Sequence, residues 1–210
     1  MSYKLIIEKL WRNEKKFITR DELKSYSKML KLPYESIISY LLSNGYLVRI
    51  LRGIFYIKSI EEKKKKIINI SFHEAIAEAL KIKKITNWYF GLESAIKLNN
   101  LTHEYFTIDY IISDKLKRPR PIKILGHKVK FISIKKELLN FGIKRDKTPY
   151  SDIEKTILDI VYFSFYNNLS EPEIKNKIGD YLPKCNRKKL KAYSEYYPKT
   201  VSKFIEKEKT

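Results

Sequence analysis

The sequence predicts an α+β protein built in two parts, the second of which ends in helices. Apolar residues recur at helical spacing in several segments, and shorter runs of β-branched and aromatic residues lie between them. Hydrophobic residues make up 43% of the 210 residues, which is enough for packed cores. A charged run separates two segments that each have their own apolar pattern. We therefore expect an N-terminal domain at 1–60, a charged linker at 61–66 and a mixed α+β domain at 67–210.

The first sixty residues predict three helices. Apolar residues at helical spacing over 5–11 form the first helix. The second begins at a capping box, in which the side chains of Thr19 and Glu22 each accept the other's backbone amide. The third covers about 33–43, with a proline at its start, and Gly45 ends it because glycine readily adopts the left-handed conformation of a helix C-terminus.

Two strands at 46–50 and 54–58 follow, with a turn at 51–53. Three helices followed by a hairpin are the order of a winged helix-turn-helix. In that arrangement the third helix enters the major groove of DNA and the hairpin, or wing, reaches the flanking backbone. Winged helices also serve as protein-docking modules. The net charge of +20 favours double-stranded DNA as the partner.

The third predicted helix carries short hydroxyl side chains on the face opposite its apolar stripe. We expect this face to meet base edges and phosphates, and the basic residues of the wing to meet the flanking backbone. Tyr40 could equally pack along the edge of the domain, and any one serine could be an ordinary exposed helix residue. The candidate DNA-binding residues are Lys31, Ser36, Ser39, Tyr40, Ser43, Arg49, Arg52 and Lys58.

The remaining residues alternate short strands and helices. A second capping box at 151–154 opens a long helix, and 67–70 is a connector or a strand. The other predicted elements are helices at 71–80, 92–98, 171–180, 187–196 and 199–208, a strand at 105–112, and a hairpin of 122–125 with 129–134.

A second basic cluster lies in a loop that two prolines stiffen. It could neutralise several phosphates or meet an acidic protein surface, and a plainly solvated loop explains it equally well. Its members are Lys115, Lys117, Arg118 and Arg120.

Four motifs, in order along the chain, resemble those of the AbiEi-type antitoxins, the transcriptional regulators of type IV toxin–antitoxin (abortive-infection) systems. Together they cover about residues 5–170. At Ile153 this chain departs from the family, which often has proline there. The motifs are Leu51-Arg52-Gly53-Ile54-Phe55-Tyr56, Tyr89-Phe90-Gly91-Leu92-Glu93-Ser94-Ala95, Gly126-His127-Lys128-Val129-Lys130-Phe131 and Ser151-Asp152-Ile153-Glu154-Lys155-Thr156-Ile157-Leu158-Asp159.

The resemblance implies a repressor that binds inverted repeats upstream of its own toxin–antitoxin operon, as a monomer or a dimer on DNA. It also implies a C-terminal domain that neutralises a nucleotidyltransferase-like toxin, without requiring a stable complex. Alternatively, the basic C-terminal domain neutralises the toxin by binding an acidic surface of it directly. The chain has a single cysteine, which fits a reducing compartment. Its N-terminus does not fit a signal peptide, and its apolar runs are too short for a membrane span. We therefore expect a cytoplasmic protein without a membrane partner.

Enzymatic function is not expected, and neither is a metal or a cofactor. His73-Glu74 begins like a zinc motif, but Ala77 stands where the second histidine would be. The other histidines and Cys185 have no partner at metal spacing. A DNA nuclease targeted by the winged helix is the alternative from another class, and its site would use Asp109, Glu154 and Lys155. We attribute Glu154 instead to the capping box, and Lys155 to an ion pair one helical turn along with Asp159.

Overall fold

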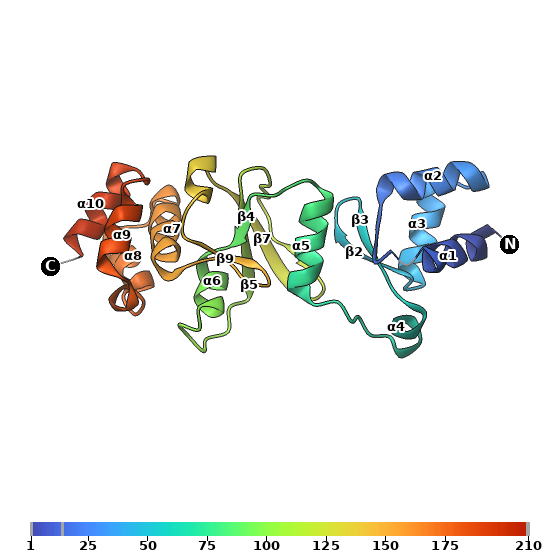
Figure 1. Ribbon diagram of the computed structural model, residues 1–210, viewed down its shortest axis with the longest axis horizontal. Coiled ribbons are helices and arrows are strands. Elements are labelled where there is room, and N and C mark those ends of the chain that lie inside the picture. Colours follow the sequence, from blue (N-terminus) through green and yellow to red (C-terminus); the bar gives the residue numbers. More distant parts are fainter. Residues whose placement is uncertain (1, 14, 209–210) are drawn as a thin grey trace. The chain divides into compact units, whose positions relative to one another are not determined.

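The computed structural model describes residues 2–13 and 15–208 (Figure 1). The chain forms two compact units: unit 1 ends at Lys84 and unit 2 begins at Ile85. Helices and strands occur in both, so the expected α+β class is confirmed. No helix among the described residues is long and apolar enough to cross a membrane.

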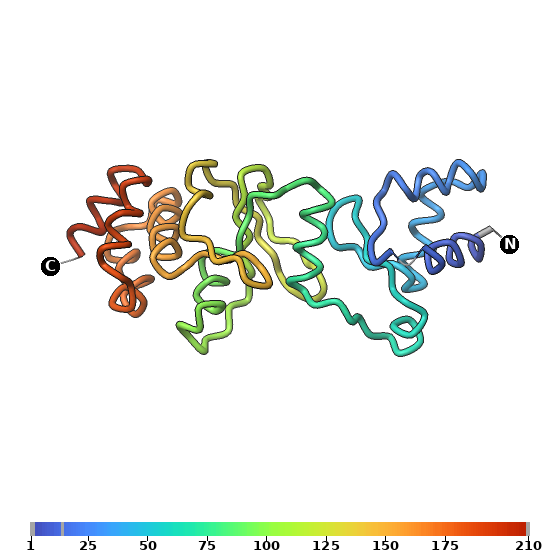
Figure 2. The backbone as a smooth tube through the Cα atoms, in the orientation of Figure 1, coloured from blue at the N-terminus to red at the C-terminus, as the bar shows by residue number. Residues whose placement is uncertain are grey.

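Unit 1 begins with three helices and three strands, which Figure 2 traces from blue to cyan. The strands form an antiparallel sheet in the order β1-β3-β2, and β2 shifts register by one residue after Arg49. Apolar side chains from the helices and the sheet, such as Ile6, Leu23, Ile37 and Leu41, are fully buried together. The elements are α1 (Ser2–Arg12), β1 (Phe17–Thr19), α2 (Arg20–Leu30), α3 (Tyr34–Ser43), β2 (Leu47–Leu51) and β3 (Ile54–Ile57).

The expected linker at 61–66 is instead most of a helix, α4 (Ile60–Lys65). Ser59 and Glu62 form a capping box at its start. The carboxylate of Glu62 is buried and accepts hydrogen bonds from the Tyr56 hydroxyl at 2.8 Å and the Asn69 amide at 2.6 Å. The charged run at 61–66 is therefore mostly helical because Glu62 is hydrogen-bonded to β3 and to the loop that follows the helix.

A further helix, α5 (Phe72–Ile82), completes unit 1 and contacts β2 and β3. Ala75, Ile76, Ala79 and Leu80 on this helix have no exposed surface. The expected start of the second domain at residue 67 thus differs from the structure, in which the chain divides between residues 84 and 85.

Unit 2 is built on a six-stranded mixed sheet in the order β6-β7-β5-β4-β9-β8. β5 pairs in parallel with β7, and β4 with β9, while the other pairs are antiparallel. The hairpin expected near residue 126 is confirmed, and β4, β8 and β9 were not predicted. The strands are β4 (Trp88–Phe90), β5 (Ile108–Ser113), β6 (Ile122–Ile124), β7 (His127–Ser133), β8 (Ile143–Arg145) and β9 (Pro149–Ser151).

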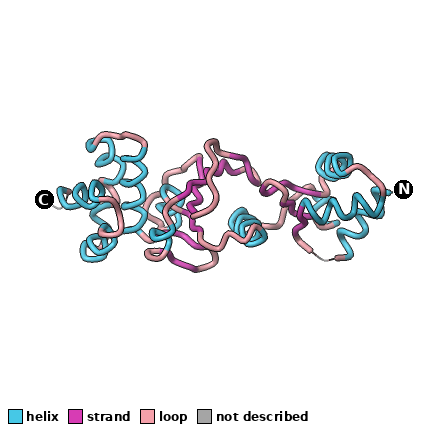
Figure 3. Tube along the Cα trace, turned by 90° about the horizontal axis from the view of Figure 1, so that it is seen from above, coloured by secondary structure: helices cyan, strands magenta, loops and turns pink. Residues whose placement is uncertain are grey.

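The helices of unit 2 group around α7, which contacts α6, α8, α9 and α10. In Figure 3 the cyan helices nearest the C-terminus lie together beside the magenta strands. The expected helical end is confirmed, with each helix one or two residues shorter than predicted. The helices are α6 (Leu92–Leu98), α7 (Ile153–Tyr166), α8 (Glu171–Ile178), α9 (Arg187–Ser194) and α10 (Lys199–Lys207), with single 3-10 turns at Lys136–Leu139 and Leu182–Lys184.

The predicted capping box at the start of α7 is wrong. Asp152 is the N-cap, and its side chain accepts the Lys155 amide at 2.9 Å, whereas Ser151 belongs to β9. Glu154 turns away from the helix start because it accepts the Asn186 amide at 2.9 Å, which ties α7 to α9.

A polar network lies in the core of unit 2 around Asp159, which has no exposed surface. Its carboxylate accepts hydrogen bonds from the hydroxyls of Tyr89, at 2.7 Å, and Tyr197, at 2.6 Å. The amino group of Lys155 lies 3.3 Å from the same carboxylate, so the expected pair between these residues is confirmed, but in the core. Burial lowers the pKa of Lys155 and raises the pKa of both tyrosines. The network joins β4, α7 and the segment that precedes α10.

Candidate nucleic-acid interface

Helix α3 presents two different faces. Ile37 and Leu41 have no exposed surface and fix the helix against the core of unit 1. Ser36 and Ser39, which lie away from that stripe, are exposed. This burial of one side and exposure of the other allows the helix to present short hydroxyl groups to a partner without disturbing the core.

Tyr40 is less available than its sequence position suggests, whereas Ser43 is exposed. The Tyr40 ring stacks on Tyr3 of α1 at 4.4 Å between ring centroids and also on Tyr46 at 6.2 Å. The Ser43 hydroxyl donates to the backbone carbonyl of Tyr40 at 3.2 Å. Of the two readings of Tyr40, the structure therefore favours packing along the edge of the domain.

The β2–β3 hairpin carries the predicted basic residues. Arg49 is exposed, and its guanidinium lies over the Phe55 ring at 5.7 Å, which limits its motion. Arg52 is exposed at the turn, where Gly53 adopts a φ of +78°. Lys58 is half-buried, and its backbone carbonyl accepts the indole N–H of Trp11 at 2.9 Å.

The region before α3 contributes a further cation. Lys31 is exposed at the left-handed C-cap of α2, between α2 and α3. Arg20 was not among the predicted residues. Its guanidinium lies over the ring of Tyr34 in the first turn of α3 at 5.6 Å, and its amide donates to the carbonyl of Gly53 in the hairpin. Arg20 lies in the first turn of α2, where a positive charge opposes the helix dipole. This unfavourable position was the sequence signal that could have marked Arg20 as a candidate binding residue.

The second basic cluster lies in unit 2, in the loop between β5 and β6. Lys115, Lys117 and Arg120 are exposed. Arg118 is half-buried, its amide donates to the Phe131 carbonyl at 3.0 Å, and its Nε has no hydrogen-bond partner among the described residues. Three of the four cations are therefore open to a partner.

The residues of the nuclease alternative have other partners. The Lys189 amino group bridges Asp152 at 2.8 Å and Glu154 at 3.1 Å. Burial acts to raise the pKa of Glu154, but hydrogen bonds from the Asn186 backbone and from Lys189 hold it below its usual value. Within residues 2–13 and 15–208, no group of three His, Cys, Asp or Glu residues could hold a metal ion.

A histidine–aspartate pair was missed in the sequence. His127 Nδ1 lies 2.9 Å from Asp109 Oδ2, because β5 and β7 pair in parallel with Asp109 opposite Val129. The residues are far apart along the chain, so only the strand register brings them together.

No protein-family model and no curated protein matches this sequence. The fold is similar to the crystal structure of the RV2827C protein from Mycobacterium tuberculosis, with a TM-score of 0.61 and 12% sequence identity. The similarity covers 97% of this chain and 74% of that chain. At this identity it is a likeness of fold.

Proposed function

We propose that this chain is a DNA-binding transcriptional regulator of the AbiEi antitoxin type, in which α1 to β3 form a winged helix-turn-helix. The observation that carries the proposal is that one compact unit holds both the exposed serines of α3 and the basic β2–β3 hairpin. The net charge of +20 supports a polyanionic partner.

In this proposal α3 enters the major groove, where Ser36 and Ser39 face base edges. Arg49 and Arg52 on the hairpin bind phosphates beside the groove, and Arg20 binds the backbone between the helix and the hairpin. Phosphate contacts position the protein, whereas base contacts select the sequence.

We further propose that the DNA sites are inverted repeats upstream of its own operon, bound by a dimer or by two monomers. Unit 2 would act against a nucleotidyltransferase-like toxin. Both statements depend on the sequence resemblance to AbiEi-type antitoxins. The proposed protein is a regulator and has no enzymatic activity.

A mobility-shift titration on the upstream region of its own gene tests the proposal. Random DNA of equal length is titrated beside it at two salt concentrations. We expect binding to the upstream DNA to persist at the higher salt while binding to random DNA disappears, because non-specific binding depends most on released counterions. Equal shifts on both DNAs that vanish together with salt would contradict a sequence-reading regulator. DNA cleavage in added Mg²⁺ would favour the nuclease alternative instead.

Substitutions separate the two kinds of contact. Arg52→Ala should weaken binding to both DNAs, whereas Ser36→Ala should weaken binding to the upstream DNA alone, by about 1 kcal/mol or more. Lys191→Ala, on the exposed side of α9 in unit 2, is the matched control and should leave both affinities unchanged. Equal losses on both DNAs for Ser36→Ala would show that α3 does not read bases.

A further inference from the structure

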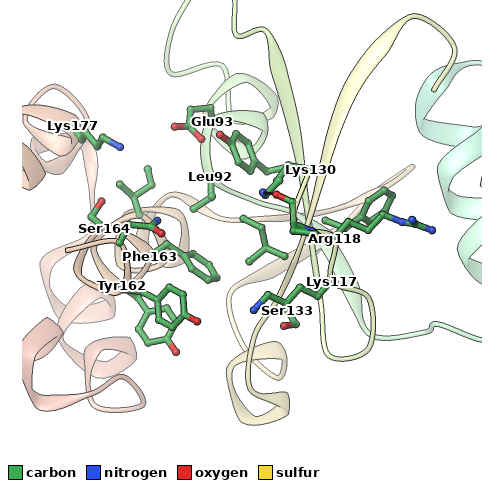
Figure 4. A pocket seen from close by; sticks show the side chains of 17 residues that line it. Leu92, Glu93, Lys117, Arg118, Lys130, Ser133, Tyr162, Phe163, Ser164 and Lys177 are labelled. Carbon is green, nitrogen blue, oxygen red and sulfur yellow. Dashed lines mark hydrogen bonds between the residues drawn. The ribbon is translucent and has the colours of Figure 1, made fainter. Parts of the chain in front are cut away.

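A cavity of about 430 Å³ lies in unit 2 between the sheet and α7 (Figure 4). Tyr110 of β5 and Ile132 of β7 line it from the sheet, and Ile160 and Phe163 line it from α7. The volume lies within the range of about 300–1,000 Å³ that is usual for small-molecule sites, which are mostly apolar with a few polar groups. The proposed DNA-binding function does not use this cavity.

Two residues that line the cavity have a buried side-chain atom without a hydrogen-bond partner among the described residues, Glu93 (Oε2) and Arg118 (Nε). Glu93 Oε2 is buried and makes no hydrogen bond to any described residue. A carboxylate oxygen can only accept hydrogen bonds, so a buried and unpaired one is costly. Burial and the charge of Glu93 together raise the pKa of the neighbouring Tyr110. An N–H donor on a ligand would satisfy the free oxygen of Glu93.

The charged groups around the cavity are otherwise cations. Its lining cations are Lys117, Arg118, Lys130 and Lys177, against the single carboxylate of Glu93. The amino group of Lys130 donates to the carbonyl of Pro119 and thereby holds the β5–β6 loop. Lys117 and Lys177 form no ion pair among the described residues. Figure 4 shows Lys177 on the same side as Glu93 and Lys117 on the other, so Lys117 is the lysine available for an anion held away from Glu93. The excess of cations favours a ligand that carries a phosphate group.

The walls between these polar groups are aromatic. Tyr162 and Phe163 pack edge to face with ring centroids 5.1 Å apart, and both line the cavity. Figure 4 shows Glu93 and Lys117 on different sides of the cavity, with Phe163 between them. A planar ring that lies against Phe163 could therefore place donors toward Glu93 and an anionic group toward Lys117.

We propose that this cavity binds a guanine nucleotide, with the base N–H groups donating to Glu93, the base plane against Phe163, and the phosphate near Lys117. Guanine presents two adjacent N–H donors on its base-pairing edge, and a carboxylate can accept both. The inference concerns unit 2 alone and does not depend on DNA binding by unit 1.

Isothermal titration of the full chain with GMP tests the proposal, with guanosine, AMP and inorganic phosphate as comparison ligands. We expect GMP to bind more tightly than guanosine, which lacks the phosphate, and than AMP, which lacks the paired donors. Phosphate alone should bind weakly. Absence of GMP binding would overturn the proposal, and so would equal binding of GMP and inorganic phosphate, since the base would then play no part.

Variants identify the groups involved. Glu93→Gln should weaken GMP binding by about tenfold or more, because it replaces a charged acceptor. Lys117→Ala should weaken GMP but leave guanosine unchanged. Lys123→Ala, an exposed lysine on β6 that does not line the cavity, is the matched control and should change neither affinity.

Thermal unfolding of the Glu93→Gln variant without ligand separates a binding role from a structural one. If Glu93 serves a ligand, removing its unpaired charge leaves the melting temperature unchanged or higher. A lower melting temperature together with unaltered GMP affinity would show that Glu93 stabilises the fold and would overturn its assignment to the ligand.

Discussion

Gly142 holds a φ of +65° beside the first turn of α7, where a Cβ atom would lie 2.7 Å from Cβ of Lys155. Its carbonyl accepts the Asp152 amide at 2.8 Å, so the backbone there is fixed on both sides. This glycine is required for two reasons: its conformation is left-handed, and its neighbours leave no room for a side chain.

We therefore predict that Gly142→Ala lowers the free energy of unfolding by about 3 kcal/mol, from backbone strain plus overpacking. Gly126→Ala is the matched control, because Gly126 also has a positive φ (+89°) but nothing lies within 4 Å of its Cβ position. The control should cost about 1 kcal/mol, the strain alone. Urea unfolding measures both variants, and equal losses would show that crowding at Gly142 is unimportant.

Cys185 provides a second prediction at this scale. Burial, followed by the charges of Glu154 and Asp152, raises the pKa of its thiol from 9.0 to about 12. At pH 8 the thiolate should then be about a thousandfold scarcer than in an ordinary cysteine, and the thiolate is the reactive form. We expect slow reaction with a disulfide reagent in the folded protein and rapid reaction in denaturant. Equal rates in both would contradict a raised pKa.

The predicted site residues show which features of the site a sequence pattern can predict. The spacing within α3 correctly separated buried Ile37 and Leu41 from exposed Ser36, because those positions depend on one helix alone. Tyr40 depends on where α1 and the following strand place Tyr3 and Tyr46, and the helical period carries no such information. The contact between Asp109 and His127 was missed for the same reason, because only the pairing of β5 with β7 brings the two residues together.

At the scale of elements, α4 illustrates how one buried acid can organise a charged segment. Burial acts to raise the pKa of Glu62, but hydrogen bonds from the Asn69 and Ser59 amides and from the Tyr56 hydroxyl bring it below its usual value. A carboxyl group with a lowered pKa stabilises the folded state above its unfolded pKa of about 4.5, and this stabilisation is lost as the pH falls.

We predict that Glu62→Gln lowers the free energy of unfolding by about 1–3 kcal/mol at pH 7, because three donors lose a charged acceptor. The difference from the natural protein should shrink at pH 3, where Glu62 becomes protonated. Glu61→Gln is the matched control, since Glu61 is exposed and its ion pair among the described residues is with exposed Lys65. Chemical unfolding at both pH values gives the comparison. An effect of Glu61→Gln as large as that of Glu62→Gln would mean that net charge, and not the buried contacts, is responsible.

The elements that were predicted correctly are those with a strong local signal, such as the capping box at Thr19 and the period of α8 to α10. β4, β8 and β9 have three residues each and were missed, because strands this short are defined by their partners. The capping box at 151–154 failed for a related reason: Glu154 found a stronger set of donors on α9 than the local amide.

For the whole molecule, the division of the chain depends on packing that charge alone does not indicate. The run at 61–66 looked like a linker because it is hydrophilic. The structure instead continues unit 1 through α5, whose small apolar residues, Ala75 and Ala79, lie against the β2–β3 sheet without exposed surface.

We predict that a fragment of residues 1–84 folds cooperatively and that a fragment of residues 1–66 does not, because the shorter one leaves the α5 side of the sheet uncovered. Circular dichroism monitors the thermal unfolding of both fragments. The longer fragment is also measured with and without Leu80→Asp, to test whether the packing of α5 is the reason that it folds. Equal unfolding transitions for both fragments would contradict this prediction and would place the boundary between the two units near residue 66.

The buried network of Asp159 has a consequence for the order in which the protein is made. Tyr197 supplies one of its hydroxyl groups, so the interior of unit 2 is complete only when synthesis has passed that residue, whereas unit 1 is complete at Lys84. At roughly 5–20 residues per second, synthesis of the intervening segment takes about 5 to 25 s. During that interval unit 1 can fold on the ribosome while Lys155 and Asp159 still lack a closed core, and the last residues of the chain determine when unit 2 is finished.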